Sequence, residues 1–272
     1  MPVPYERLDY FQYADQVRSL QDVAQVSEYG AVLENGRHYP LFRLDVPGER
    51  LLVITSGFHG EERSGPLTLA TRFRELAAAA RAAGVALTVF PCINPSGFEV
   101  GSRYNASGEK PNNDYLRYEV TPGQWKGELT TGEAFLRWKL FEGGPKETQA
   151  LRVQLEALPT PVGMLDLHQD NYTPGPWVYA YTFGEKAPYL ALLEASRRYA
   201  QIGGNLPVDE LRDVGPDGLI EFNDGSITDY FLRRGTRYVA TLETTTETPL
   251  ADTQEVDLIW AHGFIQLVGK HR

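Results

Sequence analysis

The sequence predicts an α/β fold, namely a single-domain sandwich in which helices flank a mixed and largely buried β-sheet. Apolar runs of strand length recur along the chain, and blocks with helix composition lie between them. Such alternation is typical of a sheet covered by helices. The chain has 272 residues, of which 42% are hydrophobic, so one fold of this size can bury a large core.

The predicted elements follow one another without an internal repeat or a linker-like change of composition. The apolar runs that predict strands are residues 51–54, 86–90, 163–167, 178–181 and 238–242. The blocks that predict helices are residues 67–83, 148–158, 187–201 and 255–267. Residues 105–145 are rich in Gly, Asn and Thr and too long for a simple connection, which is typical of functional or mobile loops. We therefore expect one domain over residues 1–272.

Composition and charge exclude several classes of protein. The formal net charge is −10, so the chain opposes phosphate backbones, and we expect no nucleic-acid partner. No window approaches the roughly 18 apolar residues of a membrane span, and residues 1–6 lack a basic and apolar leader pattern. The single cysteine, Cys92, lies in an apolar run and excludes a disulfide framework. These features favour a cytoplasmic protein without a membrane partner.

The segment His59-Gly60-Glu61-Glu62 carries the most informative chemistry of the chain. It lies just after the apolar run 51–54, where a strand gives way to a helix. Residues three apart in a first helical turn share a face, so the imidazole of His59 and the carboxylate of Glu62 can converge on one metal ion. A histidine and a glutamate also meet at this spacing by chance on protein surfaces, so the motif needs a third ligand.

His168 is the best placed of the remaining histidines to supply that ligand. His38 lies in a predicted hairpin, His262 in a helical pattern and His271 at the chain end. His168 instead follows the apolar run 163–167 and precedes a polar loop. The carboxyl ends of the strands are where open α/β sheets place their ligands.

Glu243 ends the apolar run that begins at Tyr238, so a carboxylate is predicted at a third strand end. A His, Glu, His zinc triad leaves a coordination position open for water, and a further carboxylate can take the proton of that water. These are the catalytic groups of a metal-dependent hydrolase. Arg103 and Arg117 flank the Gly- and Asn-rich loop and could serve an anionic substrate.

The ordered motifs resemble those of the zinc carboxypeptidase family over roughly residues 29–267, which is most of the chain. The matching segments are His59-Gly60-Glu61-Glu62, Asn94-Pro95-Ser96-Gly97-Phe98, Arg103, Gly144-Pro145-Lys146-Glu147-Thr148-Gln149-Ala150-Leu151, Asp166-Leu167-His168, and Gly225-Ser226-Ile227-Thr228-Asp229-Tyr230 followed by Gly235 and residues 238–243. The resemblance implies the carboxypeptidase fold and one catalytic zinc ion.

The resemblance also implies a role for each matching residue. His59, Glu62 and His168 correspond to the zinc ligands, a His₂Glu set known from carboxypeptidase A. Glu243 corresponds to the general base, and Arg103 to the group that stabilises the oxyanion. Asp114 corresponds to the aspartate that orients the first ligand histidine, and Arg117 to the arginine that binds the substrate carboxylate.

The chain departs from the family pattern around the expected carboxylate site. Leu116 stands where an asparagine normally helps to hold the carboxylate, although Asn112 and Asn113 lie close by. Gln169 replaces a common serine, and the pocket tyrosine expected some six residues before Ser226 is missing. Ile227 resembles a position at the base of the side-chain pocket, where an apolar residue disfavours a charged side chain. Carboxylate recognition is thus expected to differ.

Three functions follow from these residues. The first is a zinc-dependent hydrolase that cleaves an amide bond next to a carboxylate-bearing residue of a small peptide, as a metallocarboxypeptidase or a peptide amidase similar to intracellular murein peptide amidases. The second is a deacylase of N-acyl amino acids, of the succinylglutamate desuccinylase or aspartoacylase type. The third is a non-catalytic peptide-binding protein on a degenerate scaffold, against which the retention of Glu62 and Glu243 argues.

Overall fold

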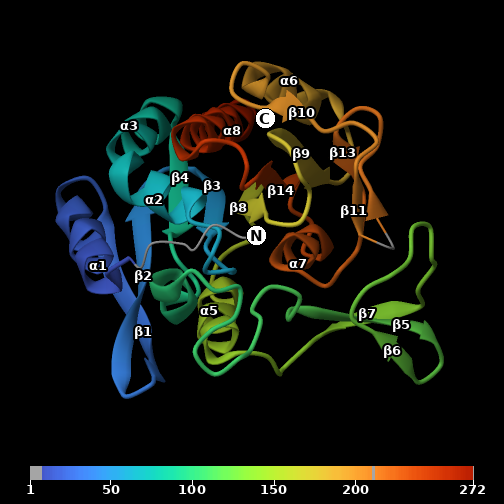
Figure 1. Cartoon of the computed structure of the whole chain (residues 1–272), viewed down its shortest axis with the longest axis horizontal. Coiled ribbons are helices and arrows are strands. Elements are labelled where there is room, and N and C mark those ends of the chain that lie inside the picture. Colours follow the sequence, from blue (N-terminus) through green and yellow to red (C-terminus); the bar gives the residue numbers. More distant parts are fainter. Residues whose placement is uncertain (1–7, 210–211, 272) are drawn as a thin grey trace.

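A nine-stranded mixed β-sheet runs through the centre of the molecule (Figure 1). The computed structural model describes residues 8–209 and 212–271, and residues 1–6, considered above for a leader, lie outside these ranges. In spatial order the sheet consists of β1 (Gln25–Glu34), β2 (Arg37–Val46), β4 (Val85–Phe90), β3 (Arg50–Ser56), β8 (Gly163–Asp170), β14 (Tyr238–Thr245), β9 (Trp177–Thr182) and β10 (Gln201–Ile202), with β13 (Leu219–Ile220) paired to β9.

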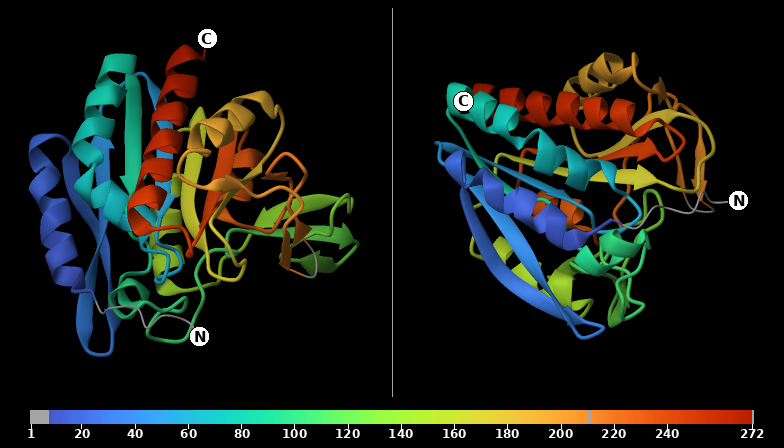
Figure 2. Two further views of the ribbon diagram at one scale, coloured as in Figure 1. Left: turned by 45° about the horizontal axis from the view of Figure 1, so that its top comes forward. Right: turned by 60° about the vertical axis from the view of Figure 1, so that its left-hand side comes forward.

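Helices cover both faces of this sheet (Figure 2). One face carries α1 (Tyr10–Arg18), α2 (Ser64–Thr71), α3 (Phe73–Ala83), α6 (Ala187–Ser196) and α8 (Leu250–Lys270), with the 3₁₀ helix η1 (Ser19–Asp22) following α1. The other face carries α5 (Lys146–Glu156), packed against β1, and α7 (Ile227–Arg233), packed against β8 and β14. The short helix α4 (Pro95–Val100) follows β4 and packs against α1 and β2.

The predicted fold class is confirmed, and each predicted apolar run is a strand of the main sheet. Strand β8 lies at the centre with all eight residues buried, which explains its continuous apolar pattern. The predicted helix 67–83 is two helices, because the chain leaves helical geometry at Arg72, with a φ of −112°. The predicted helices at 148–158, 187–201 and 255–267 correspond to α5, α6 and α8 with shifted ends.

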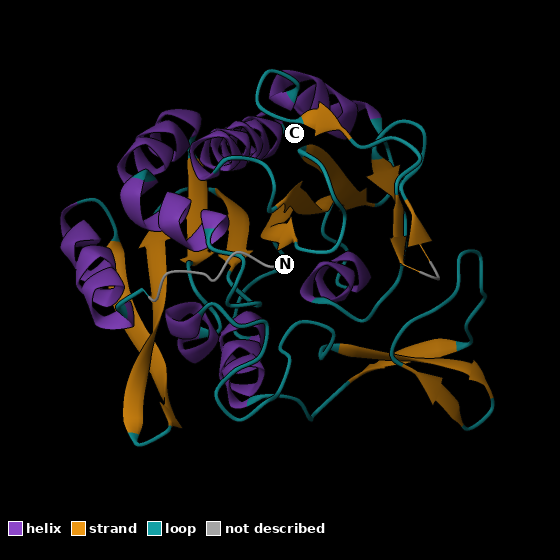
Figure 3. Cartoon of the chain, in the orientation of Figure 1, coloured by secondary structure: helices purple, strands orange, loops and turns teal. Residues whose placement is uncertain are grey.

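The aperiodic segment 105–145 contains a small sheet of its own. Its antiparallel strands are β5 (Leu116–Thr121), β6 (Gln124–Lys126) and β7 (Arg137–Leu140). Figure 3 shows this sheet standing apart from the main one, to which loops connect it. A two-stranded ribbon of β11 (Pro207–Asp209) and β12 (Arg212–Asp213) completes the strands of the described chain.

Three parallel neighbours at the centre of the sheet position the chemistry. Strand β8 pairs in parallel with β3 on one side and with β14 on the other. The carboxyl ends of all three strands therefore meet at one edge of the sheet. The sheet places Glu243 of β14 directly beside His168 of β8, and the loop after β3 carries His59. Among residues 8–209 and 212–271, no helix combines the length and apolarity needed to cross a membrane.

Candidate metal and active site

A cavity of about 450 Å³ opens at this edge of the sheet. Its walls combine the predicted catalytic groups with aromatic and charged residues of the surrounding loops. They include His59, Glu62, Arg103, Tyr104, Lys110, Asn112, Asn113, Gln169, Asp170, Tyr172, Tyr179, Tyr181, Phe183, Val208, Arg212, Phe222, Asp224, Ser226, Thr228, Thr241 and Glu243. The alternating aromatic residues of β9, Tyr179 and Tyr181, thus face the cavity together with Phe183.

The loop after β3 holds His59 and Glu62 in a tight turn. Both side chains are buried, and His59 Nδ1 lies 2.6 Å from Glu62 Oε1. Gly60 between them packs so closely on the first turn of α4 that a Cβ atom there would lie 1.9 Å from the carbonyl carbon of Gly97. Asn94 caps this first turn, because its Oδ1 accepts a hydrogen bond from Gly97 N at 2.9 Å.

Strand β8 presents His168 from the opposite side of the same carboxylate. Its Nδ1 lies 2.7 Å from Glu62 Oε2, and its Nε2 lies 2.9 Å from Asp166 Oδ2. Asp166 is two residues earlier in the strand, so both side chains emerge on one face. Thr55 of β3 donates to Asp166 Oδ1 at 2.7 Å, which fixes the carboxylate. The ring of Phe58 stacks on His168 at 5.9 Å between centroids.

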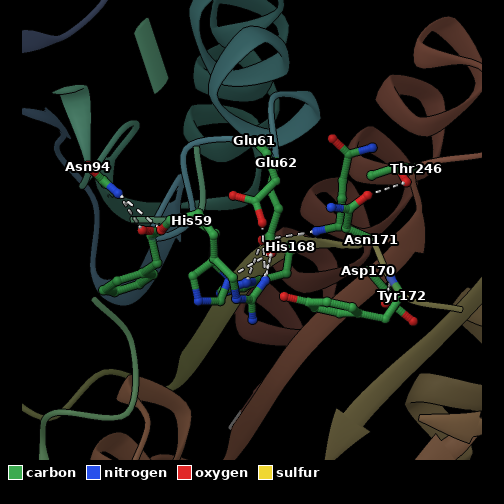
Figure 4. Close-up of polar contacts among 12 residues, drawn as sticks. His59, Glu61, Glu62, Asn94, His168, Asp170, Asn171, Tyr172 and Thr246 are labelled. Carbon is green, nitrogen blue, oxygen red and sulfur yellow. Dashed lines mark hydrogen bonds and ion pairs between the residues drawn. The ribbon is translucent and has the colours of Figure 1, made fainter. Parts of the chain in front are cut away.

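These three side chains fit a divalent metal ion. One ligand atom from each of His59, Glu62 and His168 lies within 4.8 Å of the others, and all three residues are buried. Figure 4 shows the three side chains turned toward one another. Two imidazole nitrogens and a carboxylate are a common donor set for zinc, and Asp166 supplies the outer hydrogen bond that ligand histidines normally make.

The electrostatics of this triad reflect the buried Glu62 carboxylate. Burial lowers the pKa of His59 to about 4. Burial alone would raise the pKa of Glu62, but His59 and His168 hold it well below its usual range. Burial opposes a charge on His168 as well, yet Asp166 and Glu62 raise its pKa well above the usual value. The site therefore concentrates negative charge and favours a cation.

Glu243 and Arg103 flank the triad. Glu243 Oε2 is buried and has no hydrogen-bond partner among the described residues, and burial raises the pKa of this carboxyl well above its usual range. Arg103 Nη1 lies 3.2 Å from Glu62 Oε1 and 3.3 Å from Glu61 Oε1. The ring of Tyr172 lies over this guanidinium at 5.2 Å. A carboxylate and a guanidinium thus border the cavity beside the predicted ligands.

Four of the predicted residues are not among those that line the cavity, namely His168 of the triad described above, Arg117, Ile227 and Asp114. The Arg117 guanidinium donates from Nη1 to the backbone carbonyls of Asn113 and Leu116 and stacks on the ring of Phe141, with 3.7 Å to its centroid. It is therefore engaged outside the lining residues. Ile227 is fully buried in the core cluster under α7, because the start of that helix turns it inward while the adjacent Ser226 faces the cavity.

Asp114 is not brought to His59. Its Oδ2 accepts from the backbone N–H of Asn112 at 3.3 Å, while His59 Nε2 has no hydrogen-bond partner in the described part of the chain. The orienting aspartate that the structure does provide is Asp166, and it serves His168. The predicted Asn113 does line the cavity, and its Nδ2 donates to the carbonyl of Asp224 at 3.1 Å.

The sequence contained signals for some of the residues that were missed. Asp166 lies at strand spacing from His168, which places the two side chains on one face. Gln169 follows His168, and its Oε1 accepts from Ser64 N at 2.9 Å, so it ties β8 to the start of α2. Lys110 and Arg212 carry no sequence signal, because loop cations are common, yet both line the cavity.

Comparisons with known proteins agree with this geometry. No family model matches the chain. The murein peptide amidase A of Escherichia coli K12 is 34% identical over 103 residues, which cover 36% of this chain and 41% of that protein. The matched segment thus spans less than half the length of this relative.

Solved structures match over nearly the whole chain. A protein named as a candidate metallopeptidase from Shewanella denitrificans OS217 superposes with a TM-score of 0.72 and 23% identity, covering 100% of this chain and 99% of the other. A metallo-carboxypeptidase from Burkholderia cenocepacia superposes with a TM-score of 0.64 and 18% identity, covering 96% and 69%. A murein-tripeptide amidase from Escherichia coli O157 superposes with a TM-score of 0.52 and 21% identity, covering 89% of this chain and 91% of the other.

At these levels of identity the structural matches establish the fold. The chain has a carboxypeptidase-like α/β fold, which is the fold that the resemblance drawn from its motifs implied.

Proposed function

We propose that this protein is a zinc-dependent hydrolase that cleaves an amide bond next to a carboxylate-bearing residue of a small peptide, as a metallocarboxypeptidase or a peptide amidase. The observation that carries the proposal is the convergence of His59, Glu62 and His168 within 4.8 Å of one another, beside a cavity that His59, Glu62 and Glu243 line. The names of the relatives, peptide amidase and metallo-carboxypeptidase, support the same class.

His59, Glu62 and His168 would hold the ion, which when bound supplies Lewis acidity toward the scissile carbonyl and an attacking water. Glu243 then accepts a proton from the water and delivers it to the departing amine. Its unpartnered Oε2 is free to do so. Arg103 donates hydrogen bonds to the oxygen on which negative charge develops.

Metal analysis tests the ligand set. We expect the purified protein to bind close to one zinc ion, and His168→Ala to lower zinc affinity by orders of magnitude because one of three protein ligands is lost. The core does not depend on the ion, so zinc removal should abolish turnover while the circular dichroism spectrum stays native. Full zinc affinity in His168→Ala would show that the third ligand is another residue.

A substrate screen tests the reaction. The zinc-loaded protein would be offered dipeptides, γ-glutamyl peptides and N-acyl amino acids, each with a free carboxylate and as the corresponding amide. Release of a free amine from a peptide supports the proposal, whereas turnover confined to N-acyl amino acids would make the enzyme a deacylase. Tight peptide binding without any turnover would instead indicate a binding protein. The proposal includes one catalytic domain over residues 1–272 and a cytoplasmic location.

A further inference from the structure

Arg117, the arginine predicted to bind the substrate carboxylate, is engaged by other groups of the protein. Arg117 donates to two backbone carbonyls and stacks on Phe141, and it is not among the residues that line the cavity. A substrate carboxylate in this cavity must therefore meet another cation. Besides Arg103, which is paired with Glu61 and Glu62, the described cations of the cavity wall are Lys110 and Arg212.

Lys110 lies in the wall without a counter-ion. Within residues 8–209 and 212–271 it makes no hydrogen bond or ion pair, and its side chain is accessible from the cavity. Burial lowers its pKa, and repulsion from Arg103 and Arg212 lowers it further, so these three cations act on one space. Asp114 and Asp224 are the carboxylates that act on Lys110, yet neither forms an ion pair with it.

Arg212 borders the same space from the ribbon of β11 and β12. Its guanidinium stacks over Phe222 at 4.7 Å and reaches Asp224 Oδ2 only at 4.0 Å, the limit of an ion pair. Asp224 itself accepts from the backbone of Ser226. Asp224 is thus engaged by Arg212 and by the backbone of Ser226, and it forms no ion pair with Lys110.

The loop that carries Lys110 is built to face the cavity. Of the four residues Lys110-Pro111-Asn112-Asn113, all but the proline line it. Asn112 has a φ of +140°, a conformation that L residues rarely adopt, and its buried Oδ1 has no hydrogen-bond partner in the described chain. Strain of this kind persists where the surrounding structure imposes it, and it gathers at ligand sites.

We infer that Lys110 is the residue that binds the substrate's carboxylate, with Arg212 as the second cation of the same anion subsite. The inference deepens the proposed function and rests on it for the identity of the ligand as a substrate. It replaces Arg117 in the recognition role. A cavity with the metal triad at one wall and an uncompensated cation at another selects molecules with a carboxylate at a distance from the reacting carbonyl.

A binding experiment tests the subsite without turnover. Glutarate and butyrate differ in one carboxylate, so calorimetry on the zinc-loaded protein measures what the second carboxylate contributes. We expect glutarate to bind at least roughly tenfold more tightly than butyrate, because a charge-assisted contact is added. Lys110→Met should abolish this advantage, Lys110→Arg should keep most of it, and the distant surface variant Lys270→Met should keep all of it.

The outcomes are distinct. No preference for glutarate in the unmodified protein, or a preference that survives in Lys110→Met, would overturn the inference. Because no hydrolysis is needed, loss of the preference in a protein that cleaves nothing would uphold the anion subsite while contradicting the hydrolase. If the protein hydrolyses its substrate but Lys110→Met keeps the preference for glutarate, the hydrolase is upheld and the anion subsite is contradicted.

Kinetics supply a second test once a substrate is known. Lys110→Met should lower kcat/KM for a free-carboxylate substrate by roughly tenfold or more, chiefly through KM, and should affect the matching amide far less. Arg117→Ala should change acid and amide alike, since its contacts are with the protein itself. A selective loss of the acid substrate in Arg117→Ala would return the recognition role to Arg117.

Discussion

Glu243 tests the chemistry at the scale of one residue. It borders the cavity beside His168 with an unpartnered carboxylate oxygen. We expect Glu243→Gln to keep zinc and fold but to lower kcat by roughly 10²-fold or more, the usual effect of losing a positioned general base. Glu247 is the control, because it is exposed and accepts only from the backbone of Gly175. An inactive Glu247→Gln enzyme would show that the base had been assigned to the wrong strand position.

Asp166 offers a test that does not depend on activity. It accepts a hydrogen bond from His168 and is itself fixed by Thr55. Removing its charge with Asp166→Asn should weaken zinc binding by about 10- to 100-fold, the usual cost of losing an outer partner of a ligand histidine. Competition with a chromogenic chelator measures this affinity. Unchanged affinity would mean that the strand alone orients the ring.

The convergence of His59, Glu62 and His168 was predictable from the sequence because these residues belong to local patterns. His59 and Glu62 share one turn, and His168 ends an apolar run. The residues proposed for recognition were not predictable in the same way. Arg117 lies near the cavity along the chain, but the packing of its guanidinium on Phe141 is a long-range contact that no local pattern reports. Lys110 is an ordinary loop lysine until the fold places it beside Arg103.

At the scale of elements, the contact between the loop after β3 and the first turn of α4 fixes the site. Gly60 lies against the Gly97 backbone with no room for a side chain. Gly60→Ala should therefore displace the turn that holds His59 and Glu62, lowering both zinc affinity and the melting temperature. Gly30→Ala is the control, since its added methyl would meet only ordinary contacts at 3.9 Å. Equal behaviour of the two variants in metal titration and thermal unfolding would contradict the role of this contact.

Helices and strands were predictable from the sequence where their burial produces a recognisable pattern of apolar residues. Central strands such as β8 are apolar throughout because helices cover both faces. The small sheet β5–β7 was missed because it is short and its strand β7 is exposed at every residue, so it lacks an apolar signature. The break at Arg72 was missed because α2 and α3 together have the composition of one helix.

At the scale of the whole molecule, a buried carboxyl of α8 predicts a pH dependence of stability. Asp257 is buried and accepts at Oδ2 from Ser64 and Thr68, at 2.6 and 3.0 Å. Burial raises its pKa to about 7, above the 3.8 of an unperturbed aspartate. The folded state therefore holds an extra proton between these values, so this group's stabilising contribution falls as pH rises from about 4 to 7.

Asp257→Asn should remove that dependence. The amide keeps an acceptor for Ser64 and Thr68 and carries no charge to bury. We expect the variant to be more stable than the parent at pH 8, by up to a few kcal/mol, and to exceed it by less at pH 5. Urea unfolding at the two pH values measures the difference. A variant that loses stability with pH as steeply as the parent would assign the effect to another carboxyl.

The strand order has a consequence for the nascent chain. Strand β14 lies beside β8 although the two are far apart in sequence, and β8 in turn lies beside β3. During synthesis the three proposed metal ligands have all been made once residue 168 has left the ribosome, while Glu243 and the strand that holds it do not yet exist. Pairing of distant segments is slow compared with helix formation. The three proposed ligands are thus synthesised before the proposed base, which arrives only with the last strand of the main sheet.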